Sequence, residues 1–389
     1  MALLSILVFA WCAWLIIMGF MAQLDAGHPF DFEAYYAAAE SLRFDSHASI
    51  YSVATLIHTA HQYGECVPYA PLAYVYPPLL AILLEPLTLL PCGSASVIWL
   101  VVNAVLWAGA TWLLALVVAG RWPGHRLLAI TLTSLLSFCF VQAYGGLFLG
   151  QAHIVLLFML ALAMWLAERN YPWLTGASLA LGAAIKFFPA GIVLYFLLRR
   201  RFRVVGGAML AGGCLILLML AATSATTLFA SPRAAFISVT DQTGPGLNES
   251  LVVTLPHFGS LVAMLAAAIF LVVVAMRRGD DLPGIGWTLC TVVLMSPIVW
   301  SFYLVWLMPA FCACLATLGP QRRYDARMQA SRMTLVLLYV VIAFPLWQPL
   351  RPFATLALWG LMGALYWQSG VGASVESAPA PAVAVGQRL

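Results

Sequence analysis

Two charged side chains of this chain lie in surroundings that suit them to chemistry. Lys186, the only lysine, lies inside a long apolar run, and Asp31 lies in a polar, aromatic-rich stretch near the amino terminus. A preorganised ammonium can bind an anion and stabilise charge that develops on it, whereas a carboxylate can accept the proton of a hydroxyl group. The sequence therefore offers one candidate anion-binding group and one candidate general base.

The setting of Lys186 points to a ligand. Ionisable groups in the bilayer interior are expensive and mark functional sites, and Lys186 is too far from the ends of the apolar run 174–198 to snorkel fully. Pro189 frees backbone carbonyls one turn further along, and a cation beside a broken helix suits a phosphate or a carboxylate. The structural alternative is an ammonium satisfied by a buried glutamate or by carbonyl oxygens.

The stretch around Asp31 is predicted to form a helix that begins at or just after this residue. Phe32, Tyr35, Tyr36 and Ala39 follow the helical spacing of one apolar face, which is expected to lie on the bundle or in the membrane interface. Asp31 then stands near the membrane surface, either as an N-cap that contributes roughly 1 kcal/mol or as a base. Because a helix amino terminus stabilises a carboxylate, we expect Asp31 to be ionised and not strongly basic.

Three further clusters place polar groups beside predicted membrane spans. Tyr74 and Tyr76 precede a double proline, Gln151 and His153 lie at a span boundary, and Asn248-Glu249-Ser250 lies in a second long loop at residues 223–257, where Gly244-Pro245-Gly246 allows a lid-like turn. Each cluster alone is also compatible with a structural role.

Several classes of function are disfavoured. The seven histidines are dispersed and predict no metal site. The eight cysteines form no C-x-x-C pair, and Cys66 and Cys92, the two near loops, are expected to be unpaired. No P-loop, dinucleotide-binding, G-x-S-x-G or H-E-x-x-H motif is present. The basic residues form no aromatic-interleaved patch for nucleic acid.

The elements that must position these residues are membrane helices. Hydrophobic residues make up 63% of the 389 residues and charged residues 8%, whereas a soluble domain carries roughly a quarter charged residues. Apolar runs that can cross about 30 Å of hydrocarbon predict an all-α integral membrane protein, a multi-spanning helical bundle with about twelve (10–12) transmembrane helices. The expected spans are residues 2–22, 78–90, 96–119, 127–143, 152–167, 173–198, 204–222, 258–276, 285–300, 302–318, 333–347 and 352–367.

One polytopic domain is expected at residues 1–368, with a long first loop at residues 23–77 and a disordered cytoplasmic tail at residues 369–389. If every span crosses, the loops on the side of the tail hold eleven arginines and those on the side of the first loop hold six. The positive-inside rule then puts the first loop on the extracytoplasmic side of the cell inner membrane. Arg121 and Arg126 fit poorly, and we expect the short span 78–90, which could be re-entrant, to be the cause.

In their order and spacing, these clusters resemble glycosyltransferase family 87, the polyprenyl-phosphomannose-dependent mannosyltransferases of the multi-spanning GT-C class. The resemblance runs from the first helix to about Pro309. It rests on residues 31–42 with Ile50-Tyr51, Tyr76-Pro77-Pro78 with Pro86 and Leu90-Pro91, Trp99 with Asn103, Gly150-Gln151, residues 182–189 with the basic residues 199–203, Asn248-Glu249-Ser250-Leu251 and Ser296-Pro297-Ile298-Val299-Trp300.

The resemblance implies transfer of a sugar, mannose in the simplest case, from a polyprenyl-phosphate donor to a hydroxyl of a glycolipid or polysaccharide acceptor at the outer face of the membrane. Asp31 would be the general base and Lys186 the cation for the leaving phosphate, with Arg43 and Arg233 as alternatives. No cofactor or metal is implied, because a lipid phosphate carries less charge than a nucleotide diphosphate. The implied substrate-binding residues are Glu33, Tyr35, Tyr36, Arg43, Tyr76, Gln151, His153, Asn248, Glu249, Trp300 and Tyr303.

One position departs from the family pattern. Family members often carry one or two histidines after the Ser-Pro-x-x-Trp element, where this chain has Ser301, Phe302 and Tyr303. A hydroxyphenyl group can hydrogen-bond an oxygen but cannot carry a positive charge near neutral pH. Two alternatives to an enzyme stay open. A transporter for lipid-linked sugars would carry ionisable residues in several spans and symmetric halves, and a non-catalytic partner in envelope assembly would need no histidines.

Overall fold

The computed structural model describes residues 30–45, 49–63, 74–241, 248–320 and 326–376, and within these ranges it contains helices and no strand. The α-helices are α2 (Phe30–Phe44), α3 (Val53–Tyr63), α4 (Pro78–Leu84), α5 (Cys92–Arg121), α6 (Arg126–Phe138), α7 (Val141–Phe148), α8 (His153–Glu168), α9 (Pro172–Ile185), α10 (Ala190–Leu198), α11 (Phe202–Ala222), α12 (Ala225–Asp241), α13 (Leu251–Thr254), α14 (Gly259–Met276), α15 (Asp281–Met295), α16 (Met308–Thr317), α17 (Ala326–Ala343) and α18 (Arg351–Glu376). The 3-10 helices are η1 (Glu85–Leu89), η2 (Pro123–His125), η3 (Ser301–Leu307) and η4 (Pro345–Leu350).

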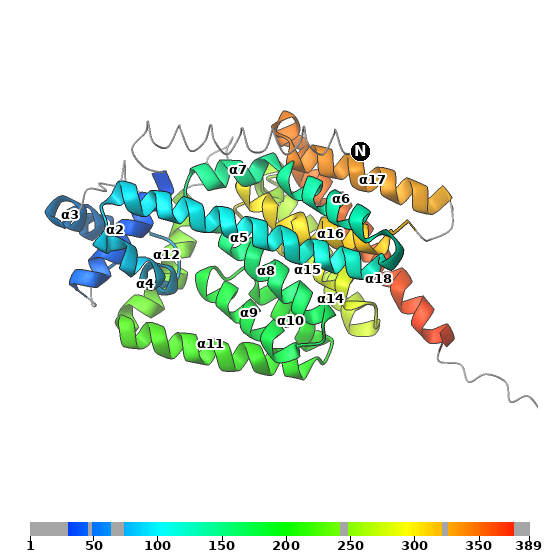
Figure 1. The fold of residues 1–389 in the computed structure, drawn as a ribbon, viewed down its shortest axis with the longest axis horizontal. Coiled ribbons are helices and arrows are strands. Elements are labelled where there is room, and N and C mark those ends of the chain that lie inside the picture. The colour runs from blue at the N-terminus through cyan, green and yellow to red at the C-terminus, as the bar shows by residue number, and fades with distance from the viewer. Residues whose placement is uncertain (1–29, 46–48, 64–73, 242–247, 321–325, 377–389) are drawn as a thin grey trace, which may run out of the picture.

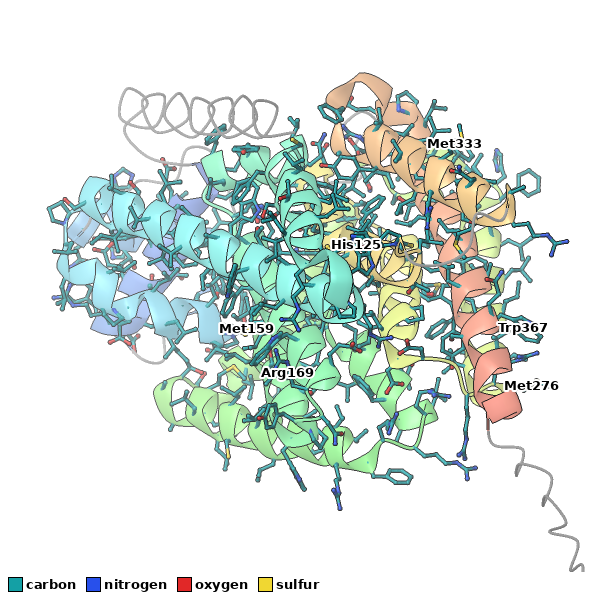
Figure 2. All side chains as sticks on the ribbon, turned by 45° about the vertical axis from the view of Figure 1, so that its right-hand side comes forward. His125, Met159, Arg169, Met276, Met333 and Trp367 are labelled. Atoms are coloured by element: carbon teal, nitrogen blue, oxygen red, sulfur yellow. The ribbon has the colours of Figure 1, made fainter. Side chains whose placement is uncertain are left out.

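Four described helices, α5, α11, α14 and α17, are long and apolar enough to cross a membrane. Residues 123–138 and α7 would make a fifth crossing if this pair, bent by 50°, is one span. Exposed apolar side chains such as Met276 of α14 and Met333 of α17 cover the outside of these helices (Figure 2). The prediction of an all-helical membrane protein is therefore confirmed, whereas the prediction of about twelve spans is not. The first predicted span, residues 2–22, lies outside the described residues.

The long axis of the molecule follows α5, whose 30 residues extend about 45 Å at the helical rise of 1.5 Å per residue. One end of this axis carries α2, α3, α4 and α12, and the end of α18 lies at the other (Figure 1). The molecule therefore has two distinct ends, and a candidate site can be placed at one of them.

Ion pairs gather at the end of the bundle where α5 finishes. Arg121, the last residue of α5, pairs with Glu168 at the end of α8 at 2.7 Å and with Asp280 before α15 at 2.6 Å. Arg199, directly after α10, lies 3.6 Å from Asp281 in the first turn of α15. We call the end of the bundle that carries these five residues the basic end, after its arginines.

The predicted span at residues 173–198 is not one continuous helix, because it is divided into α9 and α10 around Lys186. Pro189 cannot donate a backbone hydrogen bond and disfavours a helical residue before it, so the helix stops before Lys186 and restarts after Pro189. Glu168 precedes α9 and Arg199 follows α10, and both belong to the basic end. The two short helices therefore form a hairpin whose tip carries Lys186 away from that end.

The helix that carries Asp31 is enclosed by protein. α2 begins at Phe30, one residue earlier than predicted. The residues of its predicted apolar face are all buried, namely Phe32, Tyr35, Tyr36 and Ala39. Glu33 and Glu40 on its other sides are buried too, and α3, α4, α5 and η1 contact it. Of the two predicted locations, packing on the bundle is therefore confirmed.

Three other sequence predictions differ from the structure. The second long loop, residues 223–257, contains α12 and α13, although its Gly244-Pro245-Gly246 turn lies outside the described residues. α18 continues past Gln368 to Glu376, so the first part of the predicted disordered tail is helical. Cys92, predicted to be unpaired, is disulfide-bonded, whereas Cys66 lies outside the described residues.

Candidate active site

Asp31 is docked against the turn between α7 and α8. Its backbone N–H donates to the carbonyl of Leu149 at 3.0 Å, and Nε2 of Gln151 donates to Oδ2 of Asp31 at 2.7 Å. Gly150 between them has a φ of 73°, a left-handed conformation that glycine adopts without strain. The side chain of Asp31 remains partly exposed, so the turn orients this carboxylate without sealing it from the outside.

Two tyrosines hold the side-chain amide of Gln151 from the other side. The hydroxyl groups of Tyr35 and Tyr76 both donate to Oε1 of Gln151, at 3.0 and 2.7 Å, and their rings meet edge to face at 5.1 Å. All three side chains are buried. The contacts define the direction of the amide, because the reverse orientation would put Oε1 against a carboxylate oxygen.

The ammonium group of Lys186 faces three aromatic rings. Its Nζ lies 3.6 Å from the ring centroid of Tyr303, 5.1 Å from that of Trp306 and 5.2 Å from that of Tyr76. No salt bridge of Lys186 is found within the part of the chain that the structure describes. Ring faces attract a cation by about 0.5–2 kcal/mol without neutralising it. The Lys186 side chain thus lies beside Tyr76, whose hydroxyl group is bound to the amide that contacts Asp31.

Burial makes Asp31 a stronger base than an ordinary aspartate. It raises the pKa of Asp31 from 3.8 to about 6, although the hydrogen bond from Gln151 and the charge of Lys186 lower this pKa and Glu33 raises it further. The expectation that Asp31 is not strongly basic is therefore wrong, because desolvation outweighs the groups that favour the ionised form. A carboxylate with a pKa near 6 is still ionised at neutral pH and suits general base catalysis.

A second polar cluster fastens three segments of the chain together. Arg351 at the start of α18 is fully buried and its Nη1 donates to Oε1 of Glu249 at 2.5 Å. Oγ of Ser301 donates to the same oxygen at 2.6 Å, and Nη2 of Arg351 donates to the carbonyl of Phe344 at 2.9 Å. Asn248 adds a bond from its Nδ2 to the carbonyl of Pro297 at 2.9 Å. Ser301 begins η3, which also carries two of the three rings beside Lys186, Tyr303 and Trp306, so this cluster holds the segment that contacts the ammonium.

The structure brings six of the predicted site residues into one connected cluster: Asp31, Tyr35, Tyr76, Gln151, Lys186 and Tyr303. The other predicted site residues have different contacts. Tyr36 and Arg43 donate to the carbonyls of Leu90 and Thr88 and fasten α2 to its neighbours. His153 is buried, with its Nε2 3.3 Å from the carbonyl of Ala143. Trp300 stacks on Phe302, Glu33 is buried within α2, and Asn248 and Glu249 belong to the second cluster.

Three residues of these clusters were missed by the sequence reasoning. In the sequence, Trp306 is one of several aromatic residues in an apolar run, and nothing distinguishes Ser301 from other serines. Arg351 gave the clearest signal that could have been followed, because it is a lone charge between two prolines, Pro349 and Pro352, beside the last span. Within the described ranges, no group of three or more histidine, cysteine, aspartate or glutamate side chains could hold a metal ion.

Together, the fold and the cluster define a helical membrane protein in which an ionisable acid and a lysine from distant segments meet at the end opposite the basic end. The model of glycosyltransferase family 87 matches residues 74–297. This chain belongs to glycosyltransferase family 87 and is a glycosyltransferase.

Curated relatives extend this likeness over most of the chain. The polyprenol-phosphate-mannose-dependent alpha-(1-2)-phosphatidylinositol mannoside mannosyltransferase of Mycobacterium tuberculosis is 28% identical over 362 residues, which cover 84% of this chain and 81% of that protein. Two phosphatidylinositol pentamannoside mannosyltransferases are also similar. That of Mycobacterium tuberculosis is 26% identical over 70% of this chain and 67% of its own length, and that of Mycolicibacterium smegmatis is 28% identical over 72% and 67%. No solved structure matches the chain.

Proposed function

We propose that this chain transfers mannose from a polyprenyl-phosphate mannose donor to a hydroxyl group of a glycolipid acceptor of the phosphatidylinositol mannoside type. The names of the curated relatives give this donor and this acceptor class. Family membership favours an enzyme over the transporter and the non-catalytic partner. The observation that carries the proposal is the meeting of Asp31 and Lys186 across Tyr76 and Gln151.

In the proposed reaction the acceptor oxygen attacks the anomeric carbon of the donor sugar. Asp31 takes the proton of the acceptor hydroxyl as the new carbon–oxygen bond forms. The bond between the anomeric carbon and the phosphate oxygen breaks, and polyprenyl phosphate leaves with the electron pair. Lys186 stabilises the negative charge that develops on this phosphate. The aromatic rings around the ammonium hold it without competing for its charge.

The remaining predicted substrate-binding residues have different support within this proposal. The Tyr303 ring centroid lies 3.6 Å from Nζ of Lys186, so a phosphate bound by Lys186 would lie near this ring. Trp300 directly precedes η3, and its ring stacks on Phe302, which contacts the ring of Tyr303. Glu33, Tyr36 and His153 have no support as substrate contacts from the packing of their side chains.

We also propose that the cluster faces the extracytoplasmic side of a cell inner membrane. The basic end and the helix ends adjoining it carry eleven of the described arginines: Arg121, Arg126, Arg169, Arg199, Arg200, Arg201, Arg203, Arg277, Arg278, Arg327 and Arg332. The opposite end carries three: Arg43, Arg233 and Arg351. The ratio of arginines between the two ends, eleven to three, is larger than the ratio of eleven to six counted from the predicted loops. It favours a cytoplasmic location of the basic end. The disulfide of Cys92 at the other end agrees, because disulfides persist in oxidising compartments.

This orientation needs a topology that differs from the sequence prediction at two places. α4 with η1 is too short to cross and is proposed to be re-entrant, so that Arg121 and Arg126 become cytoplasmic. The α9–α10 hairpin is proposed to enter and leave at the cytoplasmic side. The proposed crossings are then residues 2–22, α5, α6 with α7, α8, α11, α14, α15, η3 with α16, α17 and α18. They form the domain of residues 1–368, with the loop at residues 23–77 outside.

The function is tested by supplying the purified full-length protein with polyprenyl-phosphate mannose and phosphatidylinositol mannoside. Released polyprenyl phosphate and extended glycolipid are measured, with nucleotide sugars as competing donors. Asp31→Asn is expected to abolish transfer, whereas Asp45→Asn, the same change at the exposed end of α2, keeps it. Transfer from a nucleotide sugar alone would reject the donor class, and full activity of Asp31→Asn would remove Asp31 from the mechanism.

The orientation has its own test. Trypsin is expected to cleave the loop at residues 199–203 in inverted membrane vesicles and to spare it in spheroplasts. Cleavage in intact spheroplasts would reverse the proposed orientation.

A further inference from the structure

The side-chain amide of Gln151 is largely occupied by the protein itself. Both acceptor positions of Oε1 are taken by the hydroxyl groups of Tyr35 and Tyr76. One of the two N–H donors of Nε2 is taken by Oδ2 of Asp31. With 9% of its surface exposed, Gln151 has little room to contact a sugar. This pattern is unlike that of a substrate-binding amide, the role that the sequence predicted for Gln151.

The two oxygens of Asp31 are not equivalent. Oδ2 is bound by Gln151, whereas no described residue donates a hydrogen bond to Oδ1. The backbone of Asp31 is itself bound to Leu149, two residues before Gln151. The left-handed Gly150 between these residues directs one backbone carbonyl and one side-chain amide toward the same aspartate. Asp31 is thus held at two points, and a single carboxylate oxygen is left for a substrate.

On the basis of the proposed function, we infer that Gln151 is a positioning residue for Asp31. Tyr35 and Tyr76 hold its side-chain amide. The amide binds one oxygen of Asp31 and thereby presents the other oxygen to the acceptor hydroxyl group. Without the two tyrosine hydroxyls, the amide could rotate and turn its oxygen toward the carboxylate. Without the amide, the carboxylate could rotate about its own side chain. Tyr35 and Tyr76 therefore act on the reaction through Gln151.

A positioning role of Gln151 makes the pH dependence of transfer sensitive to its amide, whereas a purely structural role does not. The bond from Gln151 favours the ionised form of Asp31 and so lowers its pKa. Five other titratable groups influence Asp31: Glu33 and Tyr35 on its own helix, and Tyr76, Lys186 and Tyr303 on other segments. They are unchanged in Gln151→Leu. Loss of the amide is therefore expected to raise the pKa of Asp31, so that the base needs a higher pH to become ionised.

The experiment compares the pH profile of mannose transfer in wild type and Gln151→Leu, with polyprenyl-phosphate mannose and phosphatidylinositol mannoside as substrates. The acidic limb is expected to move upward by about one to two pH units. Transfer at pH 6 should fall by about fivefold to fiftyfold, with partial recovery at pH 8 and donor KM within about twofold of wild type. Gln142→Leu, which removes another buried amide, is the matched control and should leave the profile in place.

Two milder variants keep the inference testable if Gln151→Leu does not fold. Tyr35→Phe and Tyr76→Phe each remove one hydroxyl group and keep the ring, so each should move the limb in the same direction by a smaller amount. Their double variant should approach Gln151→Leu. A raised acceptor KM with an unmoved limb would make Gln151 a substrate-binding group, and an equal loss at every pH would leave it structural; either result overturns the inference.

A measurement without substrate separates this inference from the proposed function. Infrared spectroscopy detects the protonated carboxyl of Asp31 as a band that is absent from Asp31→Asn. The pH at which this band has lost half of its intensity should rise in Gln151→Leu, whichever sugar the enzyme transfers. An unchanged midpoint of this titration would overturn the inference. Absence of transfer by wild-type protein would sink the proposed donor and acceptor instead.

Discussion

Removal of Arg351 tests how firmly the second polar cluster holds the end of the bundle that carries the site. Arg351→Met leaves the Glu249 carboxylate, whose side chain is 8% exposed, without its ion-pair partner. It also leaves the carbonyl of Phe344 without the bond from Nη2. Loss of one partner from a buried ion pair destabilises a protein by about 3–5 kcal/mol. Arg201→Met breaks an exposed pair with Asp281, where Arg201 is 56% exposed, and is expected to cost at most about 1 kcal/mol.

The loss of stability in Arg351→Met should depend on pH. Burial raises the pKa of Glu249, whereas Ser301 and Arg351 lower it. Without Arg351 the pKa in the folded protein rises further above its value in the unfolded chain. Stability that comes from such a raised pKa is present at low pH and is lost as pH rises through the folded-state pKa. The variant should therefore be most destabilised relative to wild type at alkaline pH, when Glu249 must stay ionised in a buried site.

The assay is unfolding of the purified protein in mixed micelles by added denaturing detergent, followed by far-ultraviolet circular dichroism at pH 5 and pH 8. Arg351→Met should unfold at a lower detergent fraction than Arg201→Met, and the gap should widen at pH 8. The double variant Arg351→Met with Glu249→Met, which removes both charges, should recover part of the loss. If Arg351→Met unfolded at the same detergent fraction as Arg201→Met at both pH values, the cluster of Glu249, Ser301 and Arg351 would not stabilise this end of the bundle.

Three further predictions concern the site itself. Lys186→Met should raise the donor KM at least about tenfold while changing the acceptor KM less, and equal changes in both would assign Lys186 to packing. Wild-type transfer should fall roughly tenfold per pH unit below the Asp31 pKa of about 6, because protonation removes the base; a flat profile between pH 5 and pH 8 would contradict this role. Gly150→Ala should destabilise the protein by about 1–2 kcal/mol, since φ is 73° there, and should lower transfer by moving Gln151. Gly145→Ala, which meets open space, is its control in thermal unfolding and transfer assays.

The class of the protein and much of its site could be predicted from the sequence. The shortage of charge and the recurring apolar runs specify a membrane bundle without knowledge of any contact. Asp31, Gln151 and Lys186 could be selected because polar groups are rare in such a chain and each one stands out. The order of the motifs then led to the family that the comparison supports.

The contacts among these residues could not be predicted, because they join segments that are far apart in the chain. The bond from Gln151 to Asp31 spans 120 positions, and neither residue indicates the other. The basicity of Asp31 could not be predicted for the same reason: a helix terminus can be seen in the sequence, but desolvation of its side chain depends on which elements cover it. The disulfide of Cys92 could not be predicted, because the spacing of cysteines near loops does not by itself indicate which of them pair.

The break at Lys186 explains how an apolar hairpin tolerates a charge. In one continuous span, this lysine would lie deep in hydrocarbon with no partner, at a cost of several kcal/mol. Two short helices that both leave at the basic end instead carry the ammonium to the level of Asp31, where the faces of Tyr76, Tyr303 and Trp306 replace part of its hydration. In the proposed topology the tip of this hairpin lies toward the headgroups, where the phosphate of a polyprenyl lipid would lie within reach of the lysine. A histidine in place of Tyr303, if protonated, would repel the ammonium at this distance, which gives a physical reason for a neutral ring at that position.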